Sequence, residues 1–424
     1  MNNIKSLLKN RYIKNMVILS SGTLLAQMIN VITTPIITRL YAPEQLGAYF
    51  SVLTIVSIFT PVINGRYDMA IVLSDSDEES ESLIVVSFLF GILFLIIIGF
   101  CLFIFMQVNS TVFNGIDNLI YLSLPILLVN SFINILANYH NRHKNYNLMA
   151  SVYVTQALYK AITQVSLGIV KFGILGLLIS LLLSSLVGLK KQAKFMPKFH
   201  ELYMRTKTIG ITKLVKKYKK QPLYSSPAIL MNSLSFSLMT LFINSLYSLK
   251  DAGYYSIAYS MLVLPLTLIS MNVGRVFFSK ASEELQLNGN FHDVFKKTAL
   301  GLTILSVPLF LLLMIFAERF FEFAFGVGWG RAGVIVQILS PMFAVRIVAS
   351  SLSLSFIVGG KQKIELVLQS ILLIETISIF YFALIFKLSI ENYLTIYGSI
   401  LLITYLVWIM IMNNLSKQKS VGRS

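Results

Sequence analysis

Long apolar stretches separated by short polar ones follow each other along this chain of 424 residues. A helix needs roughly 20 apolar residues to cross the hydrocarbon core of a bilayer. Within the stretches the apolar residues are continuous, unlike the alternating residues of a membrane β-barrel strand. The pattern predicts an all-α membrane protein with twelve transmembrane helices, at residues 16–38, 46–64, 83–107, 119–138, 148–169, 173–189, 223–247, 253–273, 297–317, 333–357, 364–386 and 393–412.

The composition supports a membrane protein with many crossings. Hydrophobic residues make up 56% of the chain and charged residues only 12%, whereas a soluble domain has about 25% charged residues. The first apolar stretch is longer than the roughly 7–15 residues of a secretion signal, and no A-x-A cleavage site follows it. We therefore expect this stretch to remain as the first helix.

Basic residues are distributed unevenly between the two sides of the expected membrane. With the N-terminus in the cytoplasm, 27 of the 35 lysines and arginines fall in cytoplasmic segments. The external ends and loops hold only Arg39, Lys171, Lys250, Arg319, Arg331 and Lys387. By the positive-inside rule we expect both termini in the cytoplasm. This distribution accounts for the net charge of +17 without a nucleic-acid partner.

The largest cytoplasmic segment, residues 190–222, holds eleven lysines and arginines. We expect it to be a basic linker between an N-terminal lobe (1–189) and a C-terminal lobe (223–424), each with six helices. A helix on the membrane surface, with Leu214, Val215 and Tyr218 toward the headgroups, is the simplest interpretation of the linker. Specific binding of anionic lipid heads is the alternative.

The two expected lobes resemble each other in sequence. "YAPEQLGAY" at 41–49 follows the first helix and "YSLKDAGYY" at 247–255 follows the seventh, with Tyr, Gly and Tyr at the same spacing. After the next helix come "GRYD" at 65–68 and "GRVF" at 274–277. Both repeats start on the cytoplasmic side and are therefore parallel. Secondary transporters built from such repeats place their substrate between the two halves.

Polar residues are concentrated in particular helices. The third, sixth, ninth and twelfth expected helices have no interior charge, so we expect them to face lipid, whereas the fourth carries Asn130 and Asn134. The interior charges are Lys160, Arg346 and Glu375. A charge at the centre of a bilayer costs roughly 2.5–3.5 kcal/mol even on a lenient scale. These side chains are therefore expected to face a wet interior.

Lys160 lies about 15 Å from either end of its expected helix, and Arg346 lies at a similar depth in the other half. We predict that both form a basic midpoint that binds anionic groups of a cargo. The alternative is that Glu375 neutralises one or both and holds helices together. Glu375 itself is either a coupling-ion site or a fixed ion-pair partner of Arg346.

Arg66 and Arg275 end the second and eighth expected helices at equivalent places in the two repeats. One interpretation is that each reaches to lipid phosphates at the cytoplasmic surface. The other is a symmetric pair that attracts the anionic group of an incoming cargo. Asp68 would then orient Arg66 or exchange partners with it, which makes Asp68 a second candidate for ion coupling.

Several kinds of chemistry are not encoded. No glycine-rich loop ends in Lys-Ser or Lys-Thr, so we expect no ATPase site. His140 and His143 have no third ligand near them in sequence, so we expect no metal and no cofactor. The acidic run "DSDEESES" at 75–82 is interpreted as a solvated turn or helix start.

Four segments carry a family resemblance: "RLYAPEQLGAYFSVLTIVSIF" (39–59), "RYDMAIVLSDSDEES" (66–80), "GILGLLISLLLSSLVGL" (173–189) and "FGVGWGRAGVIVQILSPMF" (325–343). Over essentially its whole length the chain resembles the polysaccharide transporter family. These are the lipid-linked oligosaccharide flippases of the multidrug/oligosaccharidyl-lipid/polysaccharide exporter superfamily. The second segment is the most specific, with Arg, Tyr, an acid, Ala-Ile and a short acidic helix.

The resemblance implies a V-shaped pair of lobes that works by alternating access in the bacterial cytoplasmic (inner) membrane. The implied cargo is an oligosaccharide repeat unit of O-antigen or capsule on undecaprenyl pyrophosphate. Its implied protein partners are the polysaccharide polymerase and chain-length regulator. There are three alternatives. A multidrug extruder usually has an acidic cavity, and a lipid II flippase has two more helices. The third alternative is an enzyme, the O-antigen polymerase, which usually has a large periplasmic loop.

The charge distribution makes a topology prediction. Reporter fusions after residues 145, 205 and 362 should report a cytoplasmic location, and those after 250 and 390 an external one, because lysines and arginines are retained in the cytoplasm during insertion. Paired alkaline phosphatase and fluorescent-protein fusions measure this. An external signal at 205, within the eleven basic residues of the linker, would overturn the topology.

Overall fold

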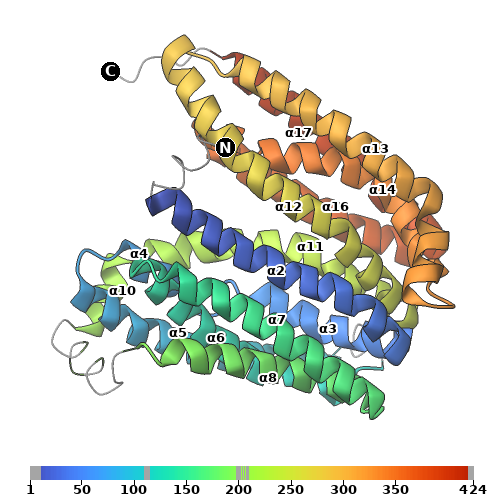
Figure 1. The fold of residues 1–424 in the computed structure, drawn as a ribbon, viewed down its shortest axis with the longest axis horizontal. Coiled ribbons are helices and arrows are strands. Elements are labelled where there is room, and N and C mark those ends of the chain that lie inside the picture. Colours follow the sequence, from blue (N-terminus) through green and yellow to red (C-terminus); the bar gives the residue numbers. More distant parts are fainter. Residues whose placement is uncertain are drawn as a thin grey trace. The chain divides into compact units, whose positions relative to one another are not determined.

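A computed structural model describes residues 11–108, 115–196, 202, 204, 206 and 210–418. Every regular element in this part of the chain is a helix (Figure 1). The elements are α2 Arg11–Leu40, α3 Pro43–Phe59, α4 Tyr67–Leu73, α5 Asp77–Val108, η2 Asp117–Leu122, α6 Ser123–Arg142, α7 Tyr146–Ile169, α8 Gly173–Ala193, α10 Ile211–Lys217, η3 Gln221–Ser225, α11 Ser226–Leu246, α12 Leu249–Asn288, α13 His292–Phe325, α14 Gly330–Leu352, α15 Ser355–Val358, α16 Gln362–Phe386 and α17 Ile390–Lys417.

The chain forms two compact units, Met1–Ser245 and Leu246–Ser424. The first contains α2 to α10 and nearly all of α11, and the second contains α12 to α17. The sequence assigned residues from 223 onward to the C-terminal lobe. That assignment, with the basic linker at 190–222, stays a prediction.

Helix occupies most of each of the twelve expected spans, which confirms the all-α membrane architecture. Nine helical segments of the described residues are long and apolar enough to cross a membrane. The other three expected spans coincide with α2, α3 and α7, so the count of twelve crossings stays a prediction. Helix α3 has only 17 residues, and α2 and α7 contribute many of the polar side chains described below.

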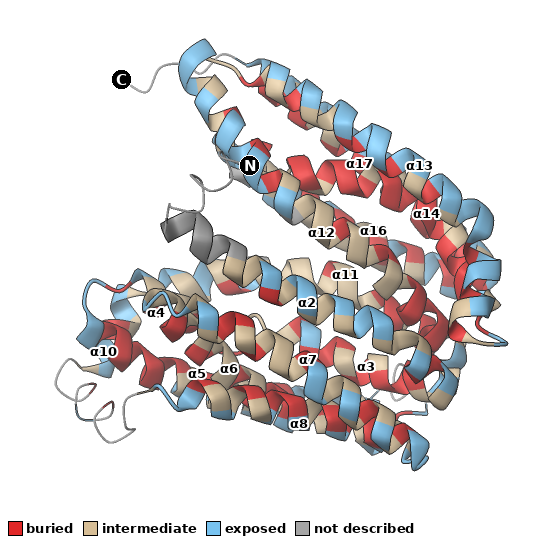
Figure 2. Ribbon diagram, viewed as in Figure 1, coloured by how far each residue is buried: buried red, intermediate tan, exposed pale blue. Residues whose placement is uncertain are grey.

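The least buried membrane-spanning helices are α5 and α13, the third and ninth of the expected series. Only 17% of the most apolar stretch of each is buried (Figure 2). Their exposed side chains are large and apolar, such as Phe100 and Ile304, as expected for a lipid-facing surface. The corresponding stretches of α8 and α17 are 39% buried. Of the four helices predicted to face lipid, α5 and α13 are therefore the two that are mostly exposed.

Helix α3 is interrupted inside its expected span, and α6 binds the interruption. The chain turns between Thr60 and Arg66 before α4 begins. The carbonyl oxygen of Thr60 accepts a hydrogen bond from Nδ2 of Asn134 at 2.8 Å, and its hydroxyl accepts one from Asn130 at 3.3 Å. A backbone carbonyl freed from a helix is tolerated in a membrane only when another group satisfies it. The polar residues of α6 satisfy this requirement.

A buried amide–hydroxyl pair holds the same break against α6. Nδ2 of Asn64 donates to the carbonyl oxygen of Ser131 at 3.1 Å, and the Ser131 hydroxyl donates to Oδ1 of Asn64 at 2.5 Å. Both residues are 1% exposed. Gly65 and Arg66 then turn the chain with positive φ angles of 57° and 62°, a backbone conformation that glycine adopts readily and arginine rarely.

Small residues allow helices to approach closely in each unit. A Cβ atom on Gly22 of α2 would lie 2.6 Å from Cβ of Ala150 on α7. On α14, a Cβ atom on Gly333 would overlap the backbone of Glu318 on α13. Close backbone approach at small residues is the usual basis of helix packing in membranes.

The short helix α10 of the basic linker docks on protein. Leu214 is 1% exposed and belongs to a hydrophobic cluster that includes Tyr67, Ile71 and Leu83. Val215 and Tyr218 pack against the same cluster. The expectation that these three side chains face headgroups is therefore wrong. The sequence of an amphipathic helix shows which face is apolar, but it does not show what packs against that face. Here α4 and α5 pack against it.

The buried pair at the break predicts a stability effect. Asn64→Ala leaves the Ser131 hydroxyl and carbonyl without their partner, so we expect a loss of about 1–3 kcal/mol of stability. Thermal unfolding of purified protein in detergent measures the loss. Asn272→Ala is the control, because the exposed Asn272 bonds only within its own helix. Equal melting temperatures for the two variants would contradict the stabilising role of the pair.

Candidate functional site

A polar cavity of about 420 Å³ lies in the first unit, among α2, α6, α7 and α8. Ligand sites in proteins usually have volumes of about 300–1,000 Å³. The lining consists mainly of amide, hydroxyl and small side chains: Thr23, Ala26, Gln27, Asn30, Thr60, Asn130, Ile133, Asn134, Tyr153, Gln156, Ala157, Lys160, Leu181, Ser184 and Ser185.

Helical spacing explains why these side chains meet in one cavity. Residues three, four and seven positions apart lie on the same face of a helix. On α7, Tyr153, Gln156 and Lys160 have this spacing, and on α6 Asn130 and Asn134 are one turn apart. Thr23, Gln27 and Asn30 of α2 have the same spacing, so three helices turn polar stripes toward the same space. The asparagines that bind the α3 break are part of its wall.

Among the described residues that line this cavity, Lys160 is the only charged one. No carboxylate among the described residues forms an ion pair with it. The cavity therefore has a single positive charge surrounded by hydrogen-bonding groups, an arrangement suited to an anionic ligand. The prediction that Lys160 faces a wet interior agrees with this position.

Arg346 lies in the second unit and is only 6% exposed. Its guanidinium carbon is 5.2 Å from the ring centroid of Phe343 and 5.9 Å from that of Tyr405. Contacts of this kind stabilise a buried cation through the negative face of the ring. Arg346 thus lies among aromatic side chains of its own unit, whereas Lys160 lines the cavity of the other. A shared basic midpoint stays a prediction.

Glu375 on α16 has a different partner from the one predicted. Its Oε1 accepts a hydrogen bond of 2.6 Å from the hydroxyl of Thr404 on α17. Its Oε2 is buried and has no hydrogen-bond partner in the described part of the chain. The fixed ion pair with Arg346 is therefore not formed in this structure.

Arg66 and Asp68 lie together at the start of α4, as the sequence predicts. Oδ2 of Asp68 accepts a hydrogen bond from Nδ2 of Asn138 at 3.0 Å, and the residue is 5% exposed. Burial raises the pKa of the Asp68 carboxyl, and the positive charge of Arg66 opposes this rise. Asn138 is one turn beyond Asn134, so α6 connects this acid–base pair with the cavity wall.

Arg275 is not the structural equivalent of Arg66. It is exposed in the interior of α12, which continues unbroken from Leu249 to Asn288. The first unit has Pro61 and Gly65 at its break, whereas the sequence around Arg275 has one glycine, Gly274, and no neighbouring proline. The two arginines therefore end neither equivalent helices nor similar turns.

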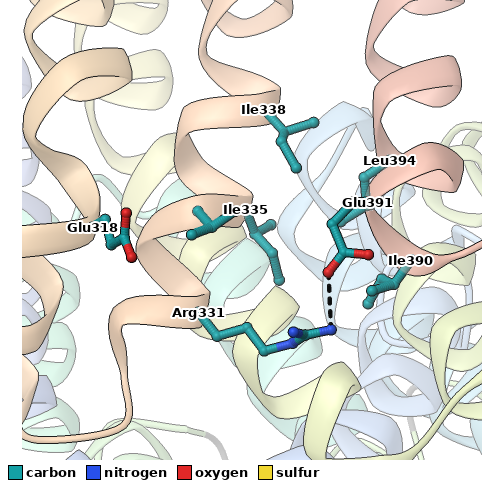
Figure 3. Close-up of a pocket in the computed structure, with 8 residues that line it drawn as sticks. Glu318, Arg331, Ile335, Ile338, Ile390, Glu391 and Leu394 are labelled. Carbon is teal, nitrogen blue, oxygen red and sulfur yellow. Dashed lines mark ion pairs between the residues drawn. The ribbon is translucent and has the colours of Figure 1, made fainter.

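A smaller cavity of about 230 Å³ lies in the second unit among α13, α14 and α17 (Figure 3). Arg331 forms ion pairs with Glu391 at 3.0 Å and with Asp251 at 3.3 Å. Because the Arg331 side chain is 48% exposed, these pairs are worth only about 0–1 kcal/mol each. They join the first turns of α12, α14 and α17.

Sequence reasoning missed most of the uncharged lining of the larger cavity. Gln27, Asn30, Tyr153 and Gln156 recur at helical spacing, which was the available signal. Among the described residues, no group of three or more histidines, cysteines or carboxylates is placed to hold a metal ion.

The model of the family described as "Polysaccharide biosynthesis protein" matches residues 36–333. No curated protein matches the chain. Among solved structures, the lipid II flippase MurJ in an inward closed conformation has 15% sequence identity and a TM-score of 0.70, covering 93% of this chain and 87% of MurJ.

Two further structures have similar folds. An inward-facing multidrug resistance MATE family transporter of the MOP superfamily has 14% identity and a TM-score of 0.70, covering 95% of this chain and 99% of that one. A MOP superfamily transporter from Pyrococcus furiosus has 13% identity and a TM-score of 0.59, covering 96% and 97% of the two chains. Identities this low show the fold alone. With the family match, they show that the chain is a multi-pass membrane protein with the MOP transporter fold and belongs to the polysaccharide biosynthesis protein family.

Proposed function

We propose that this protein is a flippase. Its cargo would be an oligosaccharide repeat unit linked to undecaprenyl pyrophosphate, moved across the bacterial cytoplasmic membrane for O-antigen or capsule synthesis. The observation that carries the proposal is the cavity with Lys160 as its only charge and amides and hydroxyls around it. Membership of a polysaccharide biosynthesis family supports the sugar as cargo.

The cavity chemistry fits such a cargo in two ways. Amide and hydroxyl side chains donate and accept hydrogen bonds, as the hydroxyl groups of a sugar do. The ammonium of Lys160 supplies charge-assisted hydrogen bonds to a phosphate or a sugar carboxylate, which are stronger than neutral ones. Binding of the cargo by Arg346, Arg66 and Arg275 remains part of the proposal, with Arg66 and Arg275 at the expected cytoplasmic surface.

The rival transport functions have weaker support. A multidrug extruder for cationic drugs needs acidic groups, and no acidic residue lines this cavity. MurJ and the inward-facing MATE family transporter have the same TM-score to this chain, 0.70, so fold does not choose between their cargoes. We infer a transporter rather than an enzyme such as an O-antigen polymerase. The polymerase and the chain-length regulator are proposed as protein partners, and both termini as cytoplasmic.

Glu375 and Asp68 are the proposed ion-coupling groups. Glu375 has one oxygen bound by Thr404 and the other buried without a partner. A proton or a sodium ion would satisfy that second oxygen. Asp68, beside Arg66, is poised to change partners if the turn at the α3 break moves.

The flippase proposal predicts the phenotype of a deletion strain and of Lys160 variants in it. The deletion strain should accumulate single lipid-linked repeat units on the cytoplasmic side and lose surface polysaccharide. Lys160→Ala should restore about ten- to a hundredfold less export than wild type, because a charge-assisted hydrogen bond is lost. Surface polymer and lipid-linked intermediates are measured together.

The matched variants separate binding from folding. Lys160→Arg should retain most export, and Lys190→Ala, at an exposed lysine near the end of α8, should export normally. Membrane levels of each variant are measured by immunoblot. Normal export by Lys160→Ala at a normal level would sink the binding role, and a deletion strain without accumulated repeat units would sink the flippase.

Coupling through Glu375 predicts a change in ion dependence. In vesicles with imposed proton or sodium gradients, Glu375→Gln should transport without the gradient dependence of wild type, because the amide has no charge to exchange. Glu365→Gln, ten residues earlier on the same helix, should keep that dependence. Unchanged gradient dependence in Glu375→Gln would show that the coupling ion binds elsewhere.

A further inference from the structure

The short helix α10 carries the docking contacts of the basic linker. One face is fixed to the protein, since Leu214 is buried against α4 and α5. On the same side, Nζ of Lys217 forms ion pairs with Asp75 at 2.7 Å and Glu79 at 2.5 Å. The hydrogen bond and the positive charge of Lys217 lower the pKa of the Asp75 carboxyl, so this carboxyl is ionised at neutral pH. The orientation of α10 is therefore set by one lysine and an apolar contact.

Four further lysines of this segment take no part in the docking. Lys213, Lys216, Lys219 and Lys220 are all exposed. No ion pair within the described residues involves any of them. Four positive charges thus lie within eight residues, two of them on α10 and two in the three residues that follow it.

The position of these lysines along the chain sets their distance from lipid. A segment long and apolar enough to cross a membrane begins at Gln221, immediately after Lys220. Its first turns expose Leu223 and Tyr224, and Tyr224 is 71% exposed. Tyrosines are enriched where a helix meets the headgroup region. The four lysines therefore lie within a few residues of the membrane surface.

We propose that Lys213, Lys216, Lys219 and Lys220 form a binding site for the headgroups of anionic phospholipids. Clusters of lysine beside a membrane-spanning helix attract anionic lipid over roughly one Debye length. Docking of α10 through Leu214 and Lys217 fixes the backbone that carries Lys213 and Lys216, and Lys219 and Lys220 follow within three residues. A fixed backbone reduces the loss of conformational freedom on binding.

The test uses the full-length protein in detergent micelles, titrated with short-chain phosphatidylglycerol and, separately, short-chain phosphatidylcholine. Phosphatidylglycerol should bind and phosphatidylcholine should not, with binding weakened by added salt. The variant Lys213→Gln/Lys216→Gln/Lys219→Gln/Lys220→Gln should bind phosphatidylglycerol about tenfold or more weakly. The fourfold Lys→Arg variant should bind as wild type, because headgroup attraction depends on the charge.

A charge-matched control distinguishes a site from general attraction. Lys296, Lys297, Lys361 and Lys363 are exposed and near the starts of membrane-spanning helices. Their fourfold replacement by Gln should weaken phosphatidylglycerol binding less than the linker variant does, because these lysines form two separate pairs rather than one cluster. A loss equal to that of the linker variant would overturn the site.

A second arm separates a lipid site from a free phosphate site. Inorganic pyrophosphate alone should neither bind measurably nor displace phosphatidylglycerol at equal ionic strength. Full competition by pyrophosphate would overturn the assignment to a lipid headgroup. Thermal unfolding and size-exclusion profiles of every variant confirm that folded protein is compared. None of these measurements depends on transport, so they stand apart from the flippase proposal.

Discussion

The hydrogen bonds from α6 to the interrupted helix α3 are the constraint on which the first unit depends. The carbonyl of Thr60 has lost its helical partner, and Asn134 supplies a donor at 2.8 Å. Asn130 and Asn134 also form part of the cavity wall, so the residues that make the break tolerable shape the candidate binding site. Replacing them with apolar residues would leave a freed carbonyl in the membrane and remove polar lining at once. Fold and site therefore share residues here.

The sequence predicts the helices well because the membrane imposes a single length and polarity on each of them. Lys160 could be assigned to a wet interior for the same reason, since the cost of an ammonium group facing lipid excludes the other choice. The asparagines of α6 gave a similar but weaker signal. In each of these cases the prediction needs only the polarity of one residue and of the medium around it.

Outcomes that depend on pairs of elements could not be predicted. Glu375 bonds to Thr404 rather than to Arg346. The rotation of each helix about its own axis decides which side chains meet, and the sequence pattern of one helix does not specify that rotation. The likeness of "GRYD" and "GRVF" suggested equivalent arginines, yet Pro61 and Gly65 surround a break in one repeat and α12 runs unbroken in the other. Leu214 was placed at headgroups because its own helix could not reveal α4 and α5 as its cover.

The two units use buried or enclosed positive charge differently. In the first, Lys160 lines a cavity with amides and hydroxyls and no acid. In the second, the rings of Phe343 and Tyr405 pack against Arg346, and a cation held in this way is stabilised without a ligand. An enclosed ammonium that lacks an internal counter-charge is better stabilised when an anion binds beside it. This difference favours the first unit as the place where the proposed anionic cargo binds. A contact between Arg346 and that cargo would first have to open the aromatic packing around the guanidinium.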